Sequence, residues 1–151
     1  KTIQATGWKT GYCAAPAALM EEFRRVHQFT TFSVSTPMQF ALADFLADNP
    51  SWCADLPAFY EAKRDHFCKL LGGSRFSLLP TRSTFFQLLD YADITDESDV
   101  ELARRWTHDI GVASIPLSVF CEQPFTGSRL RFCFAKDDAT LEEAARRLSA
   151  I

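Results

Sequence analysis

The chain starts with Lys1-Thr2-Ile3-Gln4-Ala5-Thr6-Gly7-Trp8-Lys9-Thr10-Gly11-Tyr12, a segment in which two lysines lie eight residues apart. Gly7 and Gly11 flank the second lysine, Lys9, and Trp8 precedes it directly. Glycines let the backbone fold tightly around a residue such as Lys9. By itself this pattern is equally compatible with an exposed turn, so its interpretation depends on how far the rest of the chain agrees with it.

The composition is that of a globular domain with a substantial core. The chain has 151 residues, of which 47% are hydrophobic and 23% charged, which excludes a disordered or coiled-coil protein. Its formal net charge of −3 gives no electrostatic basis for binding nucleic acid or an anionic membrane. No segment approaches the roughly 20 apolar residues needed to cross a bilayer, and none has the pattern of a signal peptide. Because the sequence starts at Lys1 rather than at Met, we expect it to be a piece of a longer protein.

The cysteines and histidines predict neither disulfides nor a metal site. The five cysteines are an odd number, are scattered along the chain, and have no CxxC or zinc-ligand spacing. We expect the cysteines to be small buried hydrophobic side chains in a reducing compartment, and the histidines to be structural or solvent-facing. The residues concerned are Cys13, Cys53, Cys68, Cys121 and Cys133, with His27, His66 and His108.

The first half of the chain is predicted to be helical. Apolar residues in Ala17–Thr30 recur with the period of an amphipathic helix. Ser35-Thr36-Pro37 predicts a helix start with a hydroxyl N-cap, and we expect the apolar helix that follows to be buried on several sides. After a break at Asn49-Pro50-Ser51, a longer helix is predicted from about Ala54 to Leu71, with Gly72-Gly73 as its C-terminal cap.

From Ser74 onward the period changes, and strands alternate with helices. The predicted strands are Phe76–Pro80, Thr84–Tyr91 and Arg129–Ala135, and a short apolar run, Val112–Ile115, precedes Pro116. Two helices are predicted to start with capping boxes, Ser98 with Glu101 and Thr140 with Glu143, and Gly111 is predicted to end the first of them. This order predicts a small α/β domain.

Arg131 is the second feature that indicates chemistry. It lies in the segment Leu130-Arg131-Phe132-Cys133-Phe134-Ala135, whose aromatic flanks make full solvation of the charge unexpected. A partly buried guanidinium needs an anionic partner, and its planar fork matches a carboxylate through two hydrogen bonds. From the pattern alone, an arginine on the solvent-facing side of the strand is an equally good interpretation.

The Lys1–Tyr12 segment resembles the lysine motif of the fold-type I pyridoxal-phosphate enzymes, and specifically of the class I aminotransferases. The lysine at position 9, where most of the class has arginine, is more similar to the methionine and kynurenine aminotransferase subgroup. The resemblance continues along the chain in order, through Phe32-Ser33-Val34-Ser35-Thr36-Pro37, Thr84-Phe85-Phe86, Ile115-Pro116-Leu117-Ser118-Val119-Phe120 and the Arg131 segment.

The resemblance implies roles for four residues. Lys1 would be the catalytic Schiff-base lysine and the proton shuttle, and Lys9 would hold the cofactor phosphate as a point charge. Arg131 would bind the α-carboxylate of the substrate. Phe32 would contact the active site of the neighbouring subunit, although an aromatic packed in a helix–helix junction is the alternative for that residue.

The resemblance also implies an α/β fold, the C-terminal part of the fold-type I transferase fold. Residues 1–35 would be the end of the large pyridoxal-phosphate-binding domain, 36–73 the connector helices and 74–151 the small C-terminal domain. The implied protein is a cytoplasmic homodimer that moves an amino group from an aromatic or sulfur-containing L-amino acid to a 2-oxo acid. Its other cofactor contacts would lie upstream, so we expect the 151 residues alone to be inactive.

Two alternatives stay open at this point. One is a pyridoxal-phosphate-dependent β-lyase that cleaves cysteine S-conjugates, and the other is a non-catalytic regulatory domain with the same fold. One departure from the family pattern concerns Arg82-Ser83-Thr84, because many relatives have a glycine before the Thr-Phe-Phe stretch. That departure leaves the shape of this loop and the side-chain specificity open.

Overall fold

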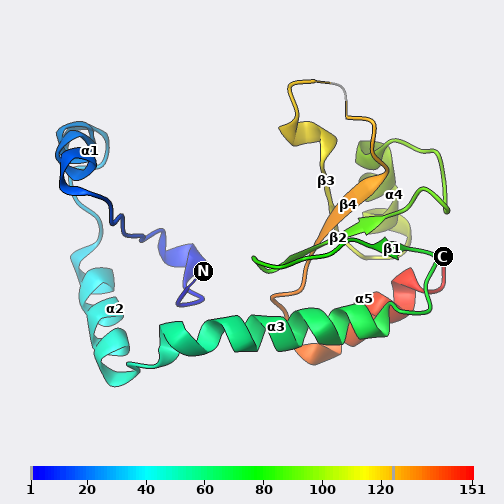
Figure 1. The fold of residues 1–151 in the computed structure, drawn as a ribbon, viewed down its shortest axis with the longest axis horizontal. Coiled ribbons are helices and arrows are strands. Elements are labelled where there is room, and N and C mark those ends of the chain that lie inside the picture. Colours follow the sequence, from blue (N-terminus) through cyan, green and yellow to red (C-terminus); the bar gives the residue numbers. More distant parts are fainter. Residues whose placement is uncertain (1, 124) are drawn as a thin grey trace. The chain divides into compact units, whose positions relative to one another are not determined.

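The computed structural model describes residues 2–123 and 125–151 (Figure 1). The chain divides into two compact units, Lys1–Leu56 and Pro57–Ile151, and the division falls within one helix, α3 (Trp52–Leu70). We call them unit 1 and unit 2 and describe each by itself.

Unit 1 contains the first two predicted helices, while the third, predicted from about Ala54 to Leu71, is α3 and continues into unit 2. The short 3-10 helix η1 (Thr6–Trp8) is followed by α1 (Ala17–Thr30), α2 (Thr36–Asp48) and the first turn of α3. Helix α1 has the predicted bounds, and Pro37 lies in the first turn of α2 as expected. Ser35 precedes α2, but its hydroxyl accepts no capping hydrogen bond among the described residues. The start of α2 was therefore predicted correctly, and the side-chain cap was not.

The apolar side chains of α1 and α2 remain exposed. None of the described residues of either helix is buried, and Phe29 and Phe40 are 85% and 66% exposed. The expectation that α2 is buried on several sides is therefore wrong for this chain, because no element of the described chain covers those faces.

Unit 2 is built on a four-stranded antiparallel sheet in the order β1-β2-β4-β3. The strands are β1 (Ser77–Leu78), β2 (Phe86–Asp90), β3 (Ile115–Pro116) and β4 (Arg129–Cys133). Strands β1, β2 and β4 lie within predicted strands, and β3 starts at the end of the apolar run Val112–Ile115. In the central pair Leu89 lies opposite Leu130, and Leu88 lies opposite Arg131. Both strands alternate between buried and half-buried residues, so one face of the sheet is buried in the core and the other carries Arg131.

The core of unit 2 forms on the buried face of the sheet. Leu89, Leu130 and Phe132 pack there with residues of α3, α4 (Asp99–Asp109) and α5 (Asp138–Leu148). Helix α5 runs beside the C-terminal half of α3 (Figure 1), where Lys63 Nζ lies 2.8 Å from Asp138 Oδ1. The predicted stripe of α5 is confirmed, with Leu141, Ala145 and Leu148 buried and Ala144 and Ile151 packed against the core.

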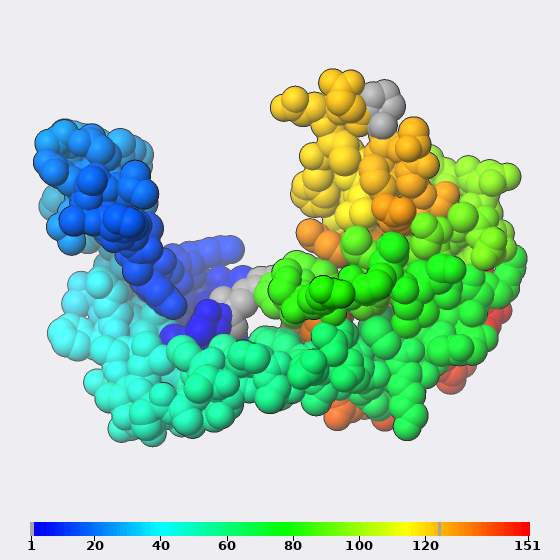
Figure 2. Space-filling model, in the orientation of Figure 1, coloured from blue at the N-terminus to red at the C-terminus, as the bar shows by residue number. Residues whose placement is uncertain are grey.

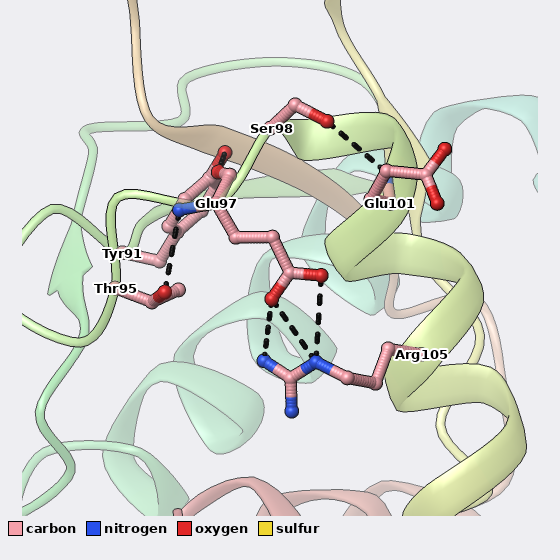
Figure 3. A network of polar contacts seen from close by, with 6 residues as sticks. All are labelled: Tyr91, Thr95, Glu97, Ser98, Glu101 and Arg105. Atoms are coloured by element: carbon pink, nitrogen blue, oxygen red, sulfur yellow. Dashed lines mark hydrogen bonds and ion pairs between the residues drawn. The ribbon is translucent and has the colours of Figure 1, made fainter.

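The helix ends agree with the sequence in two places and differ in two. Ser98 Oγ accepts a hydrogen bond from the Glu101 amide at 3.4 Å (Figure 3), and Gly111 takes a left-handed conformation with φ +67° after α4. For α5, however, the capping residue is Asp137, whose carboxylate accepts from the Thr140 amide at 2.7 Å. An aspartate was available three residues earlier, so Thr140 lies within the first turn. Gly72 and Gly73 follow α3 without a left-handed conformation.

Candidate active site

Arg131 lies at the middle of β4, on the sheet face that points away from the core. It is half-buried, as the aromatic flanks predicted, and its Cα partners in the neighbouring strands are Leu88 and Ile115. The next arginine on the same face, Arg129, forms an ion pair with Asp90 at 3.4 Å. Arg131 forms no ion pair with any described residue. Of the two arginines of this strand, therefore, only Arg129 is paired with a described carboxylate.

Two aromatic rings surround the Arg131 guanidinium. Its Cζ lies 4.1 Å from the ring centroid of Phe86 and 5.2 Å from that of Phe120. Its Nε is buried and has no hydrogen-bond partner in the described part of the chain. Leaving a buried, charged donor unpaired is costly, and a carboxylate that accepts from it would remove that cost. The geometry therefore fits an anionic ligand at this position.

Phe86 and Phe120 are site residues to which the sequence interpretation gave no role. Both lie in segments that carried the family resemblance, which is the signal that was available. Their approach to Arg131 depends on β-strand pairing and on a separate 3-10 helix, η2 (Ser118–Phe120), and a local pattern does not encode such contacts.

In the loop before β2, the left-handed backbone lies at Thr84 and not at Ser83, the position where many relatives have a glycine. Thr84 itself adopts the left-handed conformation, with φ +71°, which is an outlier for a β-branched residue. Its Oγ1 accepts a hydrogen bond from the Phe86 amide at 3.2 Å, which offsets part of the strain. The turn therefore places its strain directly before the strand that carries Phe86.

Lys9 belongs to unit 1 and ends η1. It takes a left-handed conformation with φ +53°, and its side chain is exposed and forms no hydrogen bond or ion pair with a described residue. A Cβ built on either Gly7 or Gly11 would meet nothing within 4 Å, so the space around this turn is open. An unpaired ammonium beside open backbone fits a phosphate group.

Lys1 itself lies outside the described residues, but its neighbour Thr2 is anchored. The indole Nε1 of Trp52 donates a hydrogen bond of 2.6 Å to the Thr2 carbonyl oxygen, and Trp52 packs edge-on against Phe45 with ring centroids 5.1 Å apart. The same unit contains a hollow of about 790 Å³ lined by the segment that follows, including Trp8, Thr10 and Gly11, together with Leu42 of α2.

Phe32 follows α1 in a left-handed conformation, with φ +63°, and its amide donates to the His27 carbonyl oxygen at 3.0 Å. Its side chain is 82% exposed, so it is not packed in a helix–helix junction of the described chain. A left-handed residue just after a helix is a common helix end, but glycine usually takes this conformation, so an exposed phenylalanine there is unusual.

The cysteines and histidines only partly match the expectations. All five cysteines are free, as predicted, but Cys13, Cys53 and Cys121 are exposed, so burial was predicted wrongly for those three. Cys68 is half-buried, and this burial raises the pKa of its thiol. His108 is exposed, while His66 Nε2 is buried, has no hydrogen-bond partner among the described residues, and lies 3.8 Å from Glu142 Oε1.

The described residues contain neither a cluster of metal ligands nor a membrane-spanning helix. Within residues 2–123 and 125–151, no three metal-ligating side chains cluster. Among the same described residues, no helix is both long and apolar enough to cross a membrane.

Comparison with known proteins places the chain in a family. The family described as "Aminotransferase class I and II" matches residues 1–148. A methionine aminotransferase of Escherichia coli (strain K12) is 50% identical over 148 residues, which cover 98% of this chain and 38% of the relative. Kynurenine--oxoglutarate transaminase 1 of Rattus norvegicus is 29% identical, over 98% of this chain and 40% of its own.

A solved structure agrees with these relatives. The crystal structure of YbdL from Escherichia coli, described as having a methionine aminotransferase function, superposes with a TM-score of 0.90 at 49% identity. The match covers 97% of this chain and 39% of that one. The chain thus spans about two fifths of the length of the relatives that it matches.

Proposed function

Since the chain belongs to the class I and II aminotransferase family, we propose that it is the C-terminal part of an aminotransferase that depends on pyridoxal 5′-phosphate. The observation that carries the proposal is the Arg131 guanidinium, buried at Nε without a partner on the open face of the sheet. The high identity to a methionine aminotransferase along nearly the whole chain supports it.

The domain assignment follows the same proposal. Residues 1–35 belong to the end of the large cofactor-binding domain, 36–73 form the connector helices and 74–151 form the small domain. The core of the last of these, built from the sheet, α4 and α5, also includes Phe67 and Leu71 of the connector segment, so the small domain packs on the end of the connector.

Arg131 binds the α-carboxylate of the substrate. A planar guanidinium accommodates a carboxylate through two parallel hydrogen bonds, and the aromatic rings at 4.1 and 5.2 Å hold the guanidinium away from bulk water. Arg129, paired with Asp90, is not available for this role.

Lys1 and Lys9 act on the cofactor side. When bound, pyridoxal 5′-phosphate supplies an aldehyde and an electron-accepting ring. The Lys1 amine holds the cofactor covalently between turnovers and, once released, moves the proton at the substrate Cα. Lys9 pairs with the phosphate through its ammonium, and the open backbone at Gly7 and Gly11 leaves room for that group.

The amino donors proposed are sulfur-containing or aromatic L-amino acids, such as methionine or kynurenine, with a 2-oxo acid as acceptor. The names of the relatives support this choice. We further propose a homodimer in the cytoplasm, in which Phe32 reaches the active site of the neighbouring subunit. Its 82% exposure is consistent with a side chain that contacts another subunit.

Kinetics on the complete enzyme test the substrate role of Arg131. Arg131→Lys is expected to lower kcat/KM for L-methionine by about tenfold to a hundredfold, because a lysine keeps the charge and loses the bidentate geometry. Arg129→Lys, on the same strand and face, is the matched control and is expected to stay within about twofold. Equal effects of the two substitutions would contradict the assignment.

Covalent trapping tests Lys1. Borohydride reduction is expected to fix the cofactor on Lys1, and Lys1→Ala is expected to abolish both the fixed cofactor and turnover. Cofactor fixed elsewhere would remove Lys1 from this role. Pyruvate release from a cysteine S-conjugate, without amino-group transfer to a 2-oxo acid, would favour the β-lyase instead.

A further inference from the structure

Phe120 approaches Arg131 from outside the strand that carries the arginine. It is the last residue of η2, and although its side chain is 64% exposed, its ring centroid lies 5.2 Å from Arg131 Cζ. This distance is within the roughly 6 Å over which a guanidinium is attracted to an aromatic ring. The ring of Phe86 belongs to the sheet, whereas that of Phe120 belongs to a short turn that must be held in place.

The turn has little internal support. A 3-10 helix of this length has few hydrogen bonds of its own, and here the Phe120 amide donates to the Leu117 carbonyl at 3.1 Å. In Figure 2 the yellow segment that contains η2 projects from the rest of unit 2. The position of the Phe120 ring therefore depends on contacts that η2 makes with other elements.

Asp99 supplies one such contact. It is the first residue of α4 and is only 6% exposed. Its Oδ2 accepts from the Ser118 amide at 2.8 Å, and its Oδ1 accepts from the Ser118 hydroxyl at 2.7 Å. Both carboxylate oxygens thus bind the first residue of η2, and the N-terminus of α4 favours the negative charge there.

Strand β3 fixes the chain just before this contact. Ile115 pairs with Arg131 itself, and Pro116 pairs with Leu130. Ser118 follows two residues after Pro116 and is hydrogen-bonded to Asp99. Only a few residues therefore separate Ile115, which pairs with Arg131, from Phe120. These contacts fix the start of η2, two residues before Phe120.

We propose that Phe120 is a positioning residue for carboxylate binding by Arg131, and that the hydrogen bonds between Asp99 and Ser118 hold it in that position. The inference rests on the proposed function, in which Arg131 binds the substrate carboxylate. Phe120 orients the guanidinium and excludes water from it, which strengthens the pairing with a carboxylate. Asp99 acts only through Ser118 and η2.

The test measures binding of an unreactive monocarboxylate, 3-phenylpropionate, as a competitive inhibitor of L-methionine turnover by the complete enzyme. Phe120→Ala is expected to raise its inhibition constant about tenfold, because the cation–π contact and the exclusion of water are lost. Phe120→Tyr keeps the ring and is expected to restore binding to within about twofold of the parent. Val119→Ala, an exposed neighbour in the same turn, is the control and should leave the constant unchanged.

A double-mutant cycle tests the part of Asp99 and Ser118. Ser118→Ala removes one of the two hydrogen bonds and is expected to raise the inhibition constant about threefold. Because Ser118 acts through Phe120, the Ser118→Ala/Phe120→Ala variant should match Phe120→Ala alone to within about twofold. Independent, multiplying effects would contradict the chain of contacts, and so would a Ser118→Ala variant that binds like the parent.

The Arg131→Lys variant distinguishes failure of the Phe120 inference from failure of the proposed carboxylate site at Arg131. If Arg131→Lys strongly raises the inhibition constant of 3-phenylpropionate while Phe120→Ala does not, the inference about Phe120 is overturned and the role of Arg131 stands. If Arg131→Lys leaves the inhibition constant unchanged, the proposed carboxylate site itself is wrong.

Discussion

Units 1 and 2 have similar kinds of helices but bury them very differently. Every residue of the buried hydrophobic core lies between Phe67 and Leu148, in unit 2. In unit 1 the amphipathic helix α1 has no buried residue, and Phe29 on it is 85% exposed. The comparison shows that amphipathic patterning specifies a helix in both units, and that within these 151 residues only unit 2 supplies a sheet and helices to cover the apolar faces.

The largest expected effect contrasts one aromatic residue from each unit. Trp106 is 2% exposed and packs edge-on against Phe76 with ring centroids 5.5 Å apart. Trp106→Ala is expected to lower the free energy of unfolding by about 3–5 kcal/mol, because it leaves a cavity in the core. In the 151-residue chain by itself, Phe29→Ala in unit 1 is expected to change it by about 0.5 kcal/mol or less. Urea unfolding followed by circular dichroism measures both, and similar losses would refute the contrast.

A smaller effect is expected at a polar contact of the same core. Tyr91 is 2% exposed, and its hydroxyl donates to the Glu97 carbonyl oxygen at 3.0 Å, in the network of Figure 3 where Glu97 also pairs with Arg105 at 2.8 Å. Tyr91→Phe should lower the free energy of unfolding by about 1 kcal/mol, since the ring stays packed and one hydrogen bond is lost.

Titration of the tyrosine provides a separate check. Burial, with the nearby carboxylates, raises the pKa of Tyr91 from 10.0 to about 12. A raised pKa of an acid in the folded state contributes stability below pH 10 that is lost as the pH rises towards 12. The ultraviolet difference between the parent and Tyr91→Phe should therefore titrate near pH 12, and a transition near pH 10 would contradict the burial.

The smallest effect concerns ion pairs on exposed helix surfaces, where the two units are alike. Arg25 pairs with Glu21 on α1 at 2.6 Å, and on α5 Glu143 accepts from both Arg146 and Arg147 at 2.7 Å. The hydrogen bonds from Arg146 and Arg147 lower the pKa of Glu143 from 4.5 to about 2. The ionised Glu143 carboxylate therefore contributes its full share to the free energy of unfolding above pH 4.5, and this contribution is lost as the pH falls towards 2. Unfolding midpoints of Glu143→Gln and the parent should converge over this range, and a constant difference would be inconsistent with the pairing.

The features that depend on residues close together in the sequence were predicted correctly. The bounds of α1, the cap at Ser98 and the alternation of β4 all follow from residues within a few positions of one another. The competing caps at Asp137 and Thr140 differ by one helical turn, and the aspartate prevailed because its carboxylate reaches the Thr140 amide.

The surroundings of Arg131 depend on distant residues. Phe86 and Phe120 approach the guanidinium because β2 and β3 flank β4 and because Asp99 binds η2, and none of these contacts is visible in a local pattern. The exposure of α2 was likewise unpredictable, since an apolar helix gives no information about which partner covers it.

The hydrogen bond from Trp52 to the Thr2 carbonyl also gives the protein a spectroscopic reporter. The three tryptophans occupy distinct environments, with Trp8 44% exposed, Trp106 buried in the core, and Trp52 half-buried and hydrogen-bonded to Thr2, the residue that follows Lys1 in the sequence. Indole emission responds to hydrogen bonding and to nearby chromophores. In a variant that keeps only Trp52, cofactor binding at Lys1 is therefore expected to change the emission wavelength and the intensity of the fluorescence.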